Sequence, residues 1–142
     1  MCKGYSLAGL RLGFGIANPK LLSGLFKVKD SYNVDAIAQL VGTAAIRDQN
    51  YKNTCAQKVK VSRAKLTVDL RKLDFTIRDS HGNFVLATPT SPAEDIYLSL
   101  KERGILVRYF NHPGLTDKLR ITVGNDEQNQ LLIATLETIL NK

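Results

Sequence analysis

The chain has 142 residues, of which 44% are hydrophobic and 23% are charged. These values fit one globular domain that buries a core without disulfides or metal ions, and the length is short for a whole enzyme of the larger cofactor-dependent classes. Twenty Lys and Arg against thirteen Asp and Glu leave a net charge of +7. This charge favours anionic ligands, such as phosphates, carboxylates or nucleic acid, without choosing among them.

Membrane and secretion signals are not visible in the sequence. No apolar run approaches the roughly 20 residues of a transmembrane helix, and residues 1–6 lack the apolar stretch of a signal peptide. Cys2 and Cys55 form neither a disulfide framework nor a metal-binding motif. We therefore expect a cytoplasmic chain with reduced thiols, without a membrane partner and without a bound metal.

The first half of the chain is predicted to be largely helical. Residues 10–17 alternate apolar with small or polar side chains, which predicts a strand. Asn18 and Pro19 end this strand and open a helix, because proline suits the first helical position. From residue 34 to about residue 73 there is no proline and one glycine. This stretch predicts a long helix, or two helices in tandem with a bend near residues 48–50.

The second half changes from helical to strand periodicity. Residues 75–78 and 83–87 predict two short strands around a turn at residues 79–82. Residues 105–110 and 119–123 predict two further strands. With one helix between the strand pairs and one at the end, the order is ββαββα. The fold class is α/β, with an α+β small domain whose sheet is covered by helices on one face.

Both helices of this half have capping residues. Ser91 is expected to cap the first helix, with Pro92 at its first position and Glu94 completing a capping box. Gly104 then ends that helix in the left-handed conformation. Asn125 caps the last helix, and acidic residues follow it. The predicted core of the small domain consists of Phe84, Ile96, Leu100, Ile105, Val107, Ile121, Val123, Leu132 and Leu136.

A lysine and an arginine near the start of the chain enclose a glycine-containing segment. The segment between Lys3 and Arg11 contains Gly4 and Gly9. From their spacing alone, Lys3 and Arg11 are surface cations. A sharper interpretation needs a ligand with an aldehyde at one end and a phosphate at the other. A lysine amine forms a Schiff base with an aldehyde, and an arginine holds a phosphate through two hydrogen bonds. Pyridoxal 5′-phosphate is such a ligand.

Five blocks of the sequence resemble the fold-type I aminotransferases, and within them the histidinol-phosphate aminotransferase family. The segment 3–13 is similar to the family's S-K-x-x-x-L-A-G-L-R-x-G signature. The other blocks follow in the family's order and carry the resemblance over essentially the whole chain: residues 32–39 (Y-N-V-x-x-x-A-Q), 83–84 (N-F), 103–108 (R-G-I-x-V-R) and 119–124 (L-R-I-T-x-G).

The resemblance implies a fold, a cofactor and a reaction. It implies pyridoxal-phosphate-dependent transamination of histidinol phosphate with 2-oxoglutarate or glutamate, in a homodimer whose ligands are small amino acids, 2-oxo acids and phosphates. Residues 1–18 would be a remnant of the large cofactor-binding domain. Residues 19–72 would be an interdomain helical segment, and residues 73–142 the small C-terminal domain.

The resemblance also implies roles for four residues. Lys3 would form the Schiff base and carry a proton between the substrate's Cα and the cofactor, and Arg11 would bind the cofactor phosphate. Arg120 would pair with the substrate's carboxylate, and Arg108 is a weaker candidate for a second anionic group. The alternation of strand 119–123 supports Arg120 independently, because a charged side chain in a short apolar strand needs a partner or an opening. The alternative is an edge strand with Arg120 in water.

Two features depart from the family pattern. The position before Lys3 usually carries a hydroxyl residue that helps to hold the phosphate, and here it is Cys2. The family's large domain precedes the lysine and supplies an aspartate at the pyridinium nitrogen, a ring-stacking aromatic side chain and a helix N-terminus for the phosphate. We therefore expect the 142 residues to be a C-terminal portion that is inactive alone.

Other interpretations stay open. Phosphothreonine decarboxylases share much of this pattern, so the substrate is not fixed. A non-catalytic basic module for binding or folding is the alternative from a different class. The basic residues between positions 58 and 72 have no interleaved aromatic residues, so a solvated helix face is favoured over nucleic-acid binding. His81 and His112 lie in predicted turns without further metal ligands and are expected to be solvated.

Overall fold

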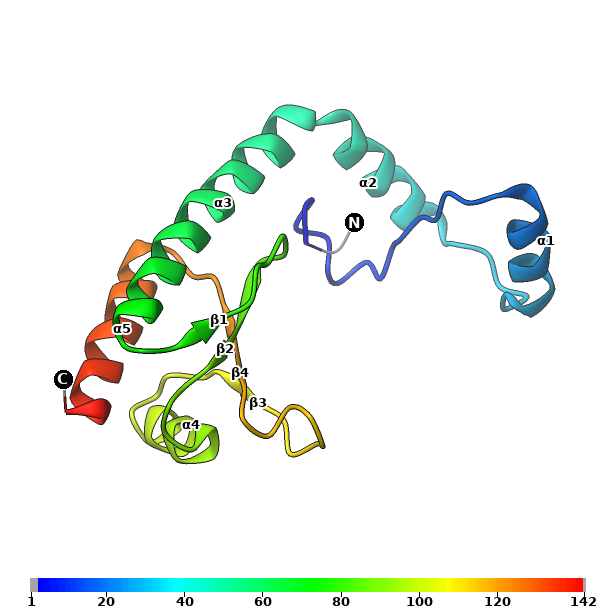
Figure 1. Ribbon diagram of the computed structural model, residues 1–142. Coiled ribbons are helices and arrows are strands. Elements are labelled where there is room, and N and C mark those ends of the chain that lie inside the picture. The colour runs from blue at the N-terminus through cyan, green and yellow to red at the C-terminus, as the bar shows by residue number, and fades with distance from the viewer. Residues whose placement is uncertain (1–2, 142) are drawn as a thin grey trace. The chain divides into compact units, whose positions relative to one another are not determined.

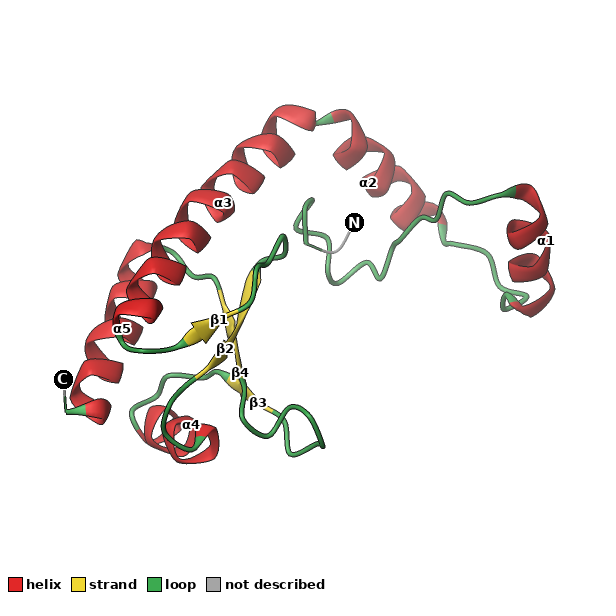
Figure 2. Cartoon of the chain, viewed as in Figure 1, coloured by secondary structure: helices red, strands yellow, loops and turns green. Residues whose placement is uncertain are grey.

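The computed structural model describes residues 3–141 of the chain (Figure 1). The chain divides into two compact units, residues 1–56 and residues 57–142. Helices form the first unit, and a sheet with helices forms the second (Figure 2). Cys2, which stands where the family pattern has a phosphate-holding hydroxyl residue, lies outside the described residues.

The first unit consists of α1 (Pro19–Val28), α2 (Ala36–Arg47) and the beginning of α3 (Gln49–Lys72). The side chain of Asn18 accepts the backbone N–H of Lys20 at 2.9 Å. It thereby satisfies one of the free N–H groups at the start of α1. The helix expected at Pro19 is confirmed, with the proline in its first turn.

Asp48 separates α2 from α3. Its backbone N–H closes the last turn of α2 on the carbonyls of Ala44 and Ala45. Its carboxylate accepts the N–H of Tyr51, in the first turn of α3, at 3.0 Å. One residue therefore ends one helix and caps the next. This confirms the pair of tandem helices with a bend near residues 48–50.

The strand predicted over residues 10–17 is not formed. Residues 8–11 make a turn, and residues 12–18 are neither helix nor strand. A strand is held by hydrogen bonds to a neighbouring strand, and within residues 3–141 the four paired strands all lie in the second unit. The alternating pattern therefore has no partner in this part of the chain, and the expected remnant strand is wrong for this structure.

The apolar side chains of the first unit are mostly exposed. Among residues 3–56, Ala38 and Gly42 alone are buried. A shallow hollow beside α1 is lined by Leu22, Leu25, Phe26, Val28 and Lys29. No helix in the described part of the chain is long and apolar enough to cross a membrane.

The second unit contains a four-stranded antiparallel sheet in the order β1-β2-β4-β3. Its strands are β1 (Thr76–Ile77), β2 (Phe84–Thr88), β3 (Arg108–Tyr109) and β4 (Leu119–Thr122). Helix α4 (Ala93–Glu102) follows β2, and α5 (Asp126–Leu140) follows β4. The predicted order ββαββα is therefore confirmed. The predicted boundary between residues 72 and 73 stays a prediction.

One face of the sheet carries the core. Val85 lies opposite Ile121 and Ala87 opposite Leu119 across β2 and β4, and all four are at most 1% exposed. Helices α3, α4 and α5 cover this face with buried leucine, isoleucine and alanine side chains: Leu66, Leu70, Ala93, Ile96, Leu100, Leu132 and Leu136. The other face of β2 and β4 is open.

Phe84 is an error in the predicted core. It is 39% exposed, because it pairs with Thr122 on the open face of the sheet. Ile105, Val107 and Val123 pack against the core but are only partly buried. The other five predicted core residues are buried: Ile96, Leu100, Ile121, Leu132 and Leu136.

Helix α4 starts differently from the prediction but ends as predicted. Pro92 is the N-cap and makes no side-chain cap bond, so the capping box expected from Ser91 is wrong. At the other end, Gly104 has φ of +77° and ends the helix as predicted. The N–H of Ile105 donates to the carbonyl of Leu100 at 2.9 Å. Because residue 105 completes this helix terminus, the expected strand 105–110 shrinks to two residues.

Candidate active site

The segment from Lys3 to Arg11 consists of two consecutive turns. The N–H of Ser6 donates to the carbonyl of Lys3 at 3.3 Å, and the N–H of Arg11 donates to the carbonyl of Ala8 at 3.4 Å. Ser6 and Arg11 have φ of 56° and 53°, a conformation that costs a non-glycine residue about 1 kcal/mol or more. The segment is therefore tightly folded, and the side chains of Lys3 and Arg11 are both exposed.

Two side chains of α3 anchor the turn that carries Lys3. The amide of Gln49 donates to the Tyr5 hydroxyl at 3.2 Å, and the hydroxyls of Ser6 and Tyr51 lie 3.2 Å apart. These contacts join residues more than 40 positions apart within the first unit. Sequence reasoning missed Gln49 and Tyr51, because no local spacing relates them to Lys3.

Arg108 and Arg120 are direct partners across β3 and β4. Both side chains emerge on the open face of the sheet, and both residues are exposed. Strand β4 pairs with β2 on one side and β3 on the other, so the edge strand of the alternative interpretation is wrong, although Arg120 is exposed as that interpretation expected. Like charges placed directly opposite each other on a sheet repel, so this pair favours an anion between or above them.

Aromatic rings take the place of carboxylates around these two arginines. The Arg120 guanidinium carbon lies 5.5 Å from the ring centre of Phe84 and 5.7 Å from that of Phe110. The Arg108 guanidinium carbon lies 5.3 Å from the ring centre of Phe110. Among residues 3–141, neither arginine forms an ion pair. Their N–H groups are therefore available to an added carboxylate or phosphate.

Two ionisable groups of the second unit have shifted pKa values. Burial, and then the negative charge of Glu94, raise the pKa of the Tyr109 hydroxyl, so this phenol is protonated at neutral pH. The hydrogen bond from Lys118 lowers the pKa of the Asp117 carboxyl, which therefore stays ionised. Tyr109 stacks on Tyr97 with ring centres 5.8 Å apart, on the side of the sheet away from Arg108.

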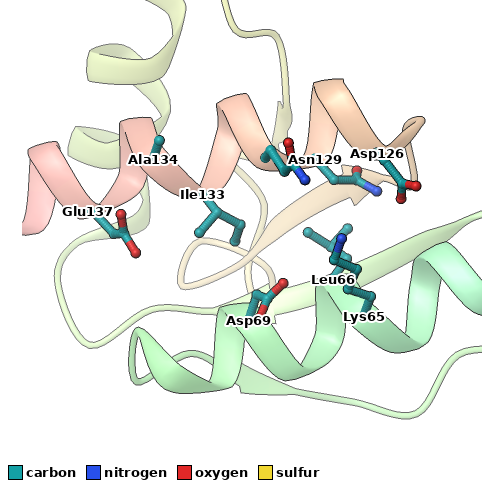
Figure 3. A pocket seen from close by; sticks show the side chains of 9 residues that line it. Lys65, Leu66, Asp69, Asp126, Asn129, Ile133, Ala134 and Glu137 are labelled. Atoms are coloured by element: carbon teal, nitrogen blue, oxygen red, sulfur yellow. The ribbon is translucent and has the colours of Figure 1, made fainter.

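A separate hollow between α3 and α5 contains none of the predicted site residues (Figure 3). The apolar side chains of Leu66, Ile133 and Ala134 line it together with polar and charged ones: Lys65, Asp69, Asp126, Asn129, Gln130 and Glu137. The carboxylate of Asp69 is already paired with Lys72 at 2.8 Å. Within residues 3–141, no three His, Cys, Asp or Glu side chains are grouped to hold a metal ion.

The structure thus groups the predicted residues in two sets. Lys3 and Arg11 lie on one folded segment of the first unit, and Arg108 and Arg120 lie side by side in the second. The family model for the class I and II aminotransferases matches residues 1–136. The chain belongs to this family. Its sheet and helices are accordingly those of fold-type I aminotransferases, as the resemblance implied.

Individual members of the family are similar over nearly all of this chain. Histidinol-phosphate aminotransferase 1 of Trichormus variabilis is 63% identical over 141 residues, which cover 99% of this chain and 40% of that protein. The crystal structure of histidinol-phosphate aminotransferase from Clostridium acetobutylicum superposes with a TM-score of 0.86 at 26% identity, covering 98% of this chain and 43% of that one.

A decarboxylase is almost as similar in structure. L-Threonine-O-3-phosphate decarboxylase from Porphyromonas gingivalis superposes with a TM-score of 0.80 at 26% identity, covering 99% of this chain and 45% of that one. The present chain thus spans about 40% of the length of the curated relatives that it matches.

Proposed function

We propose that this chain supplies the lysine and the anion-binding arginines of a pyridoxal-phosphate-dependent aminotransferase that acts on histidinol phosphate and 2-oxoglutarate, in histidine biosynthesis. The observation that carries the proposal is the placement of Arg108 directly opposite Arg120 on an open sheet face. The 63% identity to a histidinol-phosphate aminotransferase supports the choice of substrate. The homodimer and the cytoplasmic location implied by the resemblance are part of the same proposal.

The folded segment around Lys3 fits the two reactive ends of the cofactor. Lys3 offers an exposed amine for the aldehyde, and Arg11 offers an exposed guanidinium for the phosphate. Residues 1–18 contain no acidic residue, so the partner of the ring nitrogen comes from outside this segment. When bound, the cofactor withdraws electrons from the substrate's Cα. Lys3 then moves the proton to and from that carbon.

The two arginines of the sheet suit the shared chemistry of the two substrates. Glutamate and 2-oxoglutarate carry carboxylates, whereas histidinol phosphate carries a phosphate monoester. Arg120 binds a carboxylate of glutamate or 2-oxoglutarate, and Arg108 adds a second set of N–H donors. A phosphate dianion presents three oxygens and can accept from both guanidinium groups at once. A pair of arginines can therefore accept either anion in alternate half-reactions.

The 142 residues alone do not transaminate at an ordinary enzymatic rate. An exposed cation contributes at most about 1 kcal/mol to binding an anion, so Arg11 holds the cofactor weakly. Lys3 and Arg120 lie in different units, and we expect the rest of the enzyme to fix their relative position. A misplacement of about 1 Å between reacting groups can cost a hundredfold in rate. The test is amino transfer from histidinol phosphate to 2-oxoglutarate with saturating cofactor, comparing the chain with Lys3→Ala. Ordinary turnover that is lost in Lys3→Ala would refute this part of the proposal.

Decarboxylation of a phosphorylated amino acid is the second candidate. The observation in its favour is the TM-score of 0.80 to the phosphothreonine decarboxylase, at the same 26% identity as the Clostridium aminotransferase. The two reactions differ in their products. An active protein containing this chain should form glutamate from 2-oxoglutarate when histidinol phosphate is supplied. Release of carbon dioxide from phosphothreonine, without that amino transfer, would favour the decarboxylase instead.

A further inference from the structure

Phe110 lies one residue beyond β3, on the same face of the sheet as Arg108. Side chains alternate along an extended strand, so Arg108 and Phe110 share the open face while Tyr109 packs toward the core. The Phe110 carbonyl accepts the N–H of His112 at 2.9 Å, which fixes the backbone beside the ring. Phe110 is partly buried, so its ring is less free to turn than a fully solvated side chain.

The ring of Phe110 is shared by both arginines. Its centre lies 5.3 Å from the guanidinium carbon of Arg108 and 5.7 Å from that of Arg120. An aromatic face attracts a cation within about 6 Å. The two guanidinium groups would otherwise repel each other, because their strands place them directly opposite. The Phe110 ring therefore offsets the repulsion between the two guanidinium groups.

We infer that Phe110 is the positioning residue that holds Arg108 and Arg120 together as a single receptor for a dianionic group. The inference rests on the proposed anion-binding role of the two arginines. Contact with the face of a ring uses the flat side of a guanidinium, so the N–H groups along its edge stay available to an oxyanion. Phe110 itself touches no substrate in this role and acts through the arginines.

Phe84 provides a matched comparison. Its ring lies 5.5 Å from the Arg120 guanidinium carbon, on the same open face, but Arg108 makes no corresponding contact with it. Loss of Phe84 should therefore loosen one arginine, whereas loss of Phe110 should loosen both. A general structural role on the sheet surface would not produce this difference.

The experiment is solution NMR of the full chain, with the side-chain Nε–Hε signals of Arg108 and Arg120 assigned. Ring currents change the chemical shifts of protons that lie over an aromatic face. Phe110→Leu should move the chemical shifts of both arginine signals toward the value of a solvated arginine. Phe84→Leu should move the signal of Arg120 alone. Phe110→Tyr keeps an aromatic ring and should leave both signals in place. Titration with inorganic phosphate should give a Kd that is roughly two- to fivefold weaker in Phe110→Leu. Phe110→Tyr should bind as the unmodified chain does.

The outcomes separate this inference from the proposed function. If Phe110→Leu leaves both arginine signals and the phosphate Kd unchanged, the positioning role is overturned and the aminotransferase proposal stands. If phosphate shifts neither arginine in the unmodified chain, the anion-binding role is overturned, and the inference falls with it. If Phe110→Leu does not fold, Phe84→Leu still decides. Phe110 is then the remaining ring over both guanidinium groups, so signals of Arg108 and Arg120 that both stay away from the value of a solvated arginine support the role, and signals at that value overturn it.

Discussion

Asn129 and Gly124 exchange two hydrogen bonds. The Gly124 N–H donates to the Asn129 side-chain oxygen at 3.0 Å, and the Asn129 side-chain NH₂ donates to the Gly124 carbonyl at 3.1 Å. Asn129 is the buried polar residue of the described core, at 9% exposure. Its side chain thus satisfies both the N–H and the carbonyl of Gly124, as the backbone of a neighbouring strand would. It joins the end of β4, which carries Arg120, to the first turns of α5.

Asn129→Ala should therefore destabilise the second unit. The substitution leaves a partly buried N–H and carbonyl of Gly124 without partners, which costs about 1–3 kcal/mol for each buried group left unsatisfied. Denaturant unfolding of the full chain measures the change. Gln130→Ala is the control, because Gln130 is the exposed neighbour on the same helix and should change stability by less than about 0.5 kcal/mol. Equal losses in the two variants would contradict the structural role of Asn129.

The two helix starts of the second unit should respond differently to loss of their expected caps. Asn125 accepts the N–H of Gln128 at 2.8 Å, and the Gln128 side chain accepts the N–H of Asn125 at 3.0 Å. Asn125→Ala should cost about 1 kcal/mol. Ser91→Ala should cost almost nothing, because α4 has no side-chain cap bond. A loss of about 1 kcal/mol in Ser91→Ala would show that the capping box exists in solution.

This contrast shows where local sequence signals stop being sufficient. Asn125 and Ser91 both precede strong helix patterns, and both were expected to act as caps. The backbone of Pro92, with ψ of 124°, lies outside the helix and moves its start by one residue. A shift of one residue is enough to remove a cap bond, although the helix itself is where the periodicity predicts it.

The open face of the sheet shows a second limit. Alternation correctly places Phe84 and Val85 on opposite faces, but it does not say which face is buried. The cross-strand register decides this, because Val85 lies opposite Ile121 whereas Phe84 lies opposite Thr122. The family motifs indicated Arg108 and Arg120 as candidate anion-binding residues from the sequence. Their contacts with Phe84 and Phe110 depend on this register and could not be predicted.

A side chain at Gly104 should destabilise the end of α4. It ends α4 with φ of +77°, a conformation in which an L-residue is strained although the space around it is open. Gly104→Ala should cost about 1 kcal/mol. Gly82→Ala is the comparison, because a side chain there meets only ordinary contacts at 3.5 Å or more and φ is not positive. Thermal unfolding of both variants checks this, and an unaffected Gly104→Ala would contradict the helix terminus described here.

Arg120→Leu should separate stability from anion binding. Removal of one of two opposed guanidinium groups relieves repulsion, so the substitution should leave the unfolding midpoint in dilute buffer unchanged or slightly higher. Phosphate should raise the midpoint of the unmodified chain, because a ligand that binds only the folded state stabilises it. Arg120→Leu should lose this rise, whereas Arg103→Leu, at an exposed position beyond α4, should keep it. Retention of the full rise in Arg120→Leu would place the phosphate elsewhere.

The most direct test of the account is a chimera. The 141 aligned residues of the Trichormus variabilis enzyme are replaced by this chain, which is 63% identical to them. Amino transfer from histidinol phosphate to 2-oxoglutarate is then measured with and without Lys3→Ala. The account predicts an active chimera whose kcat falls at least about a thousandfold in Lys3→Ala. A folded chimera that is inactive, or one that keeps its rate without Lys3, would contradict it.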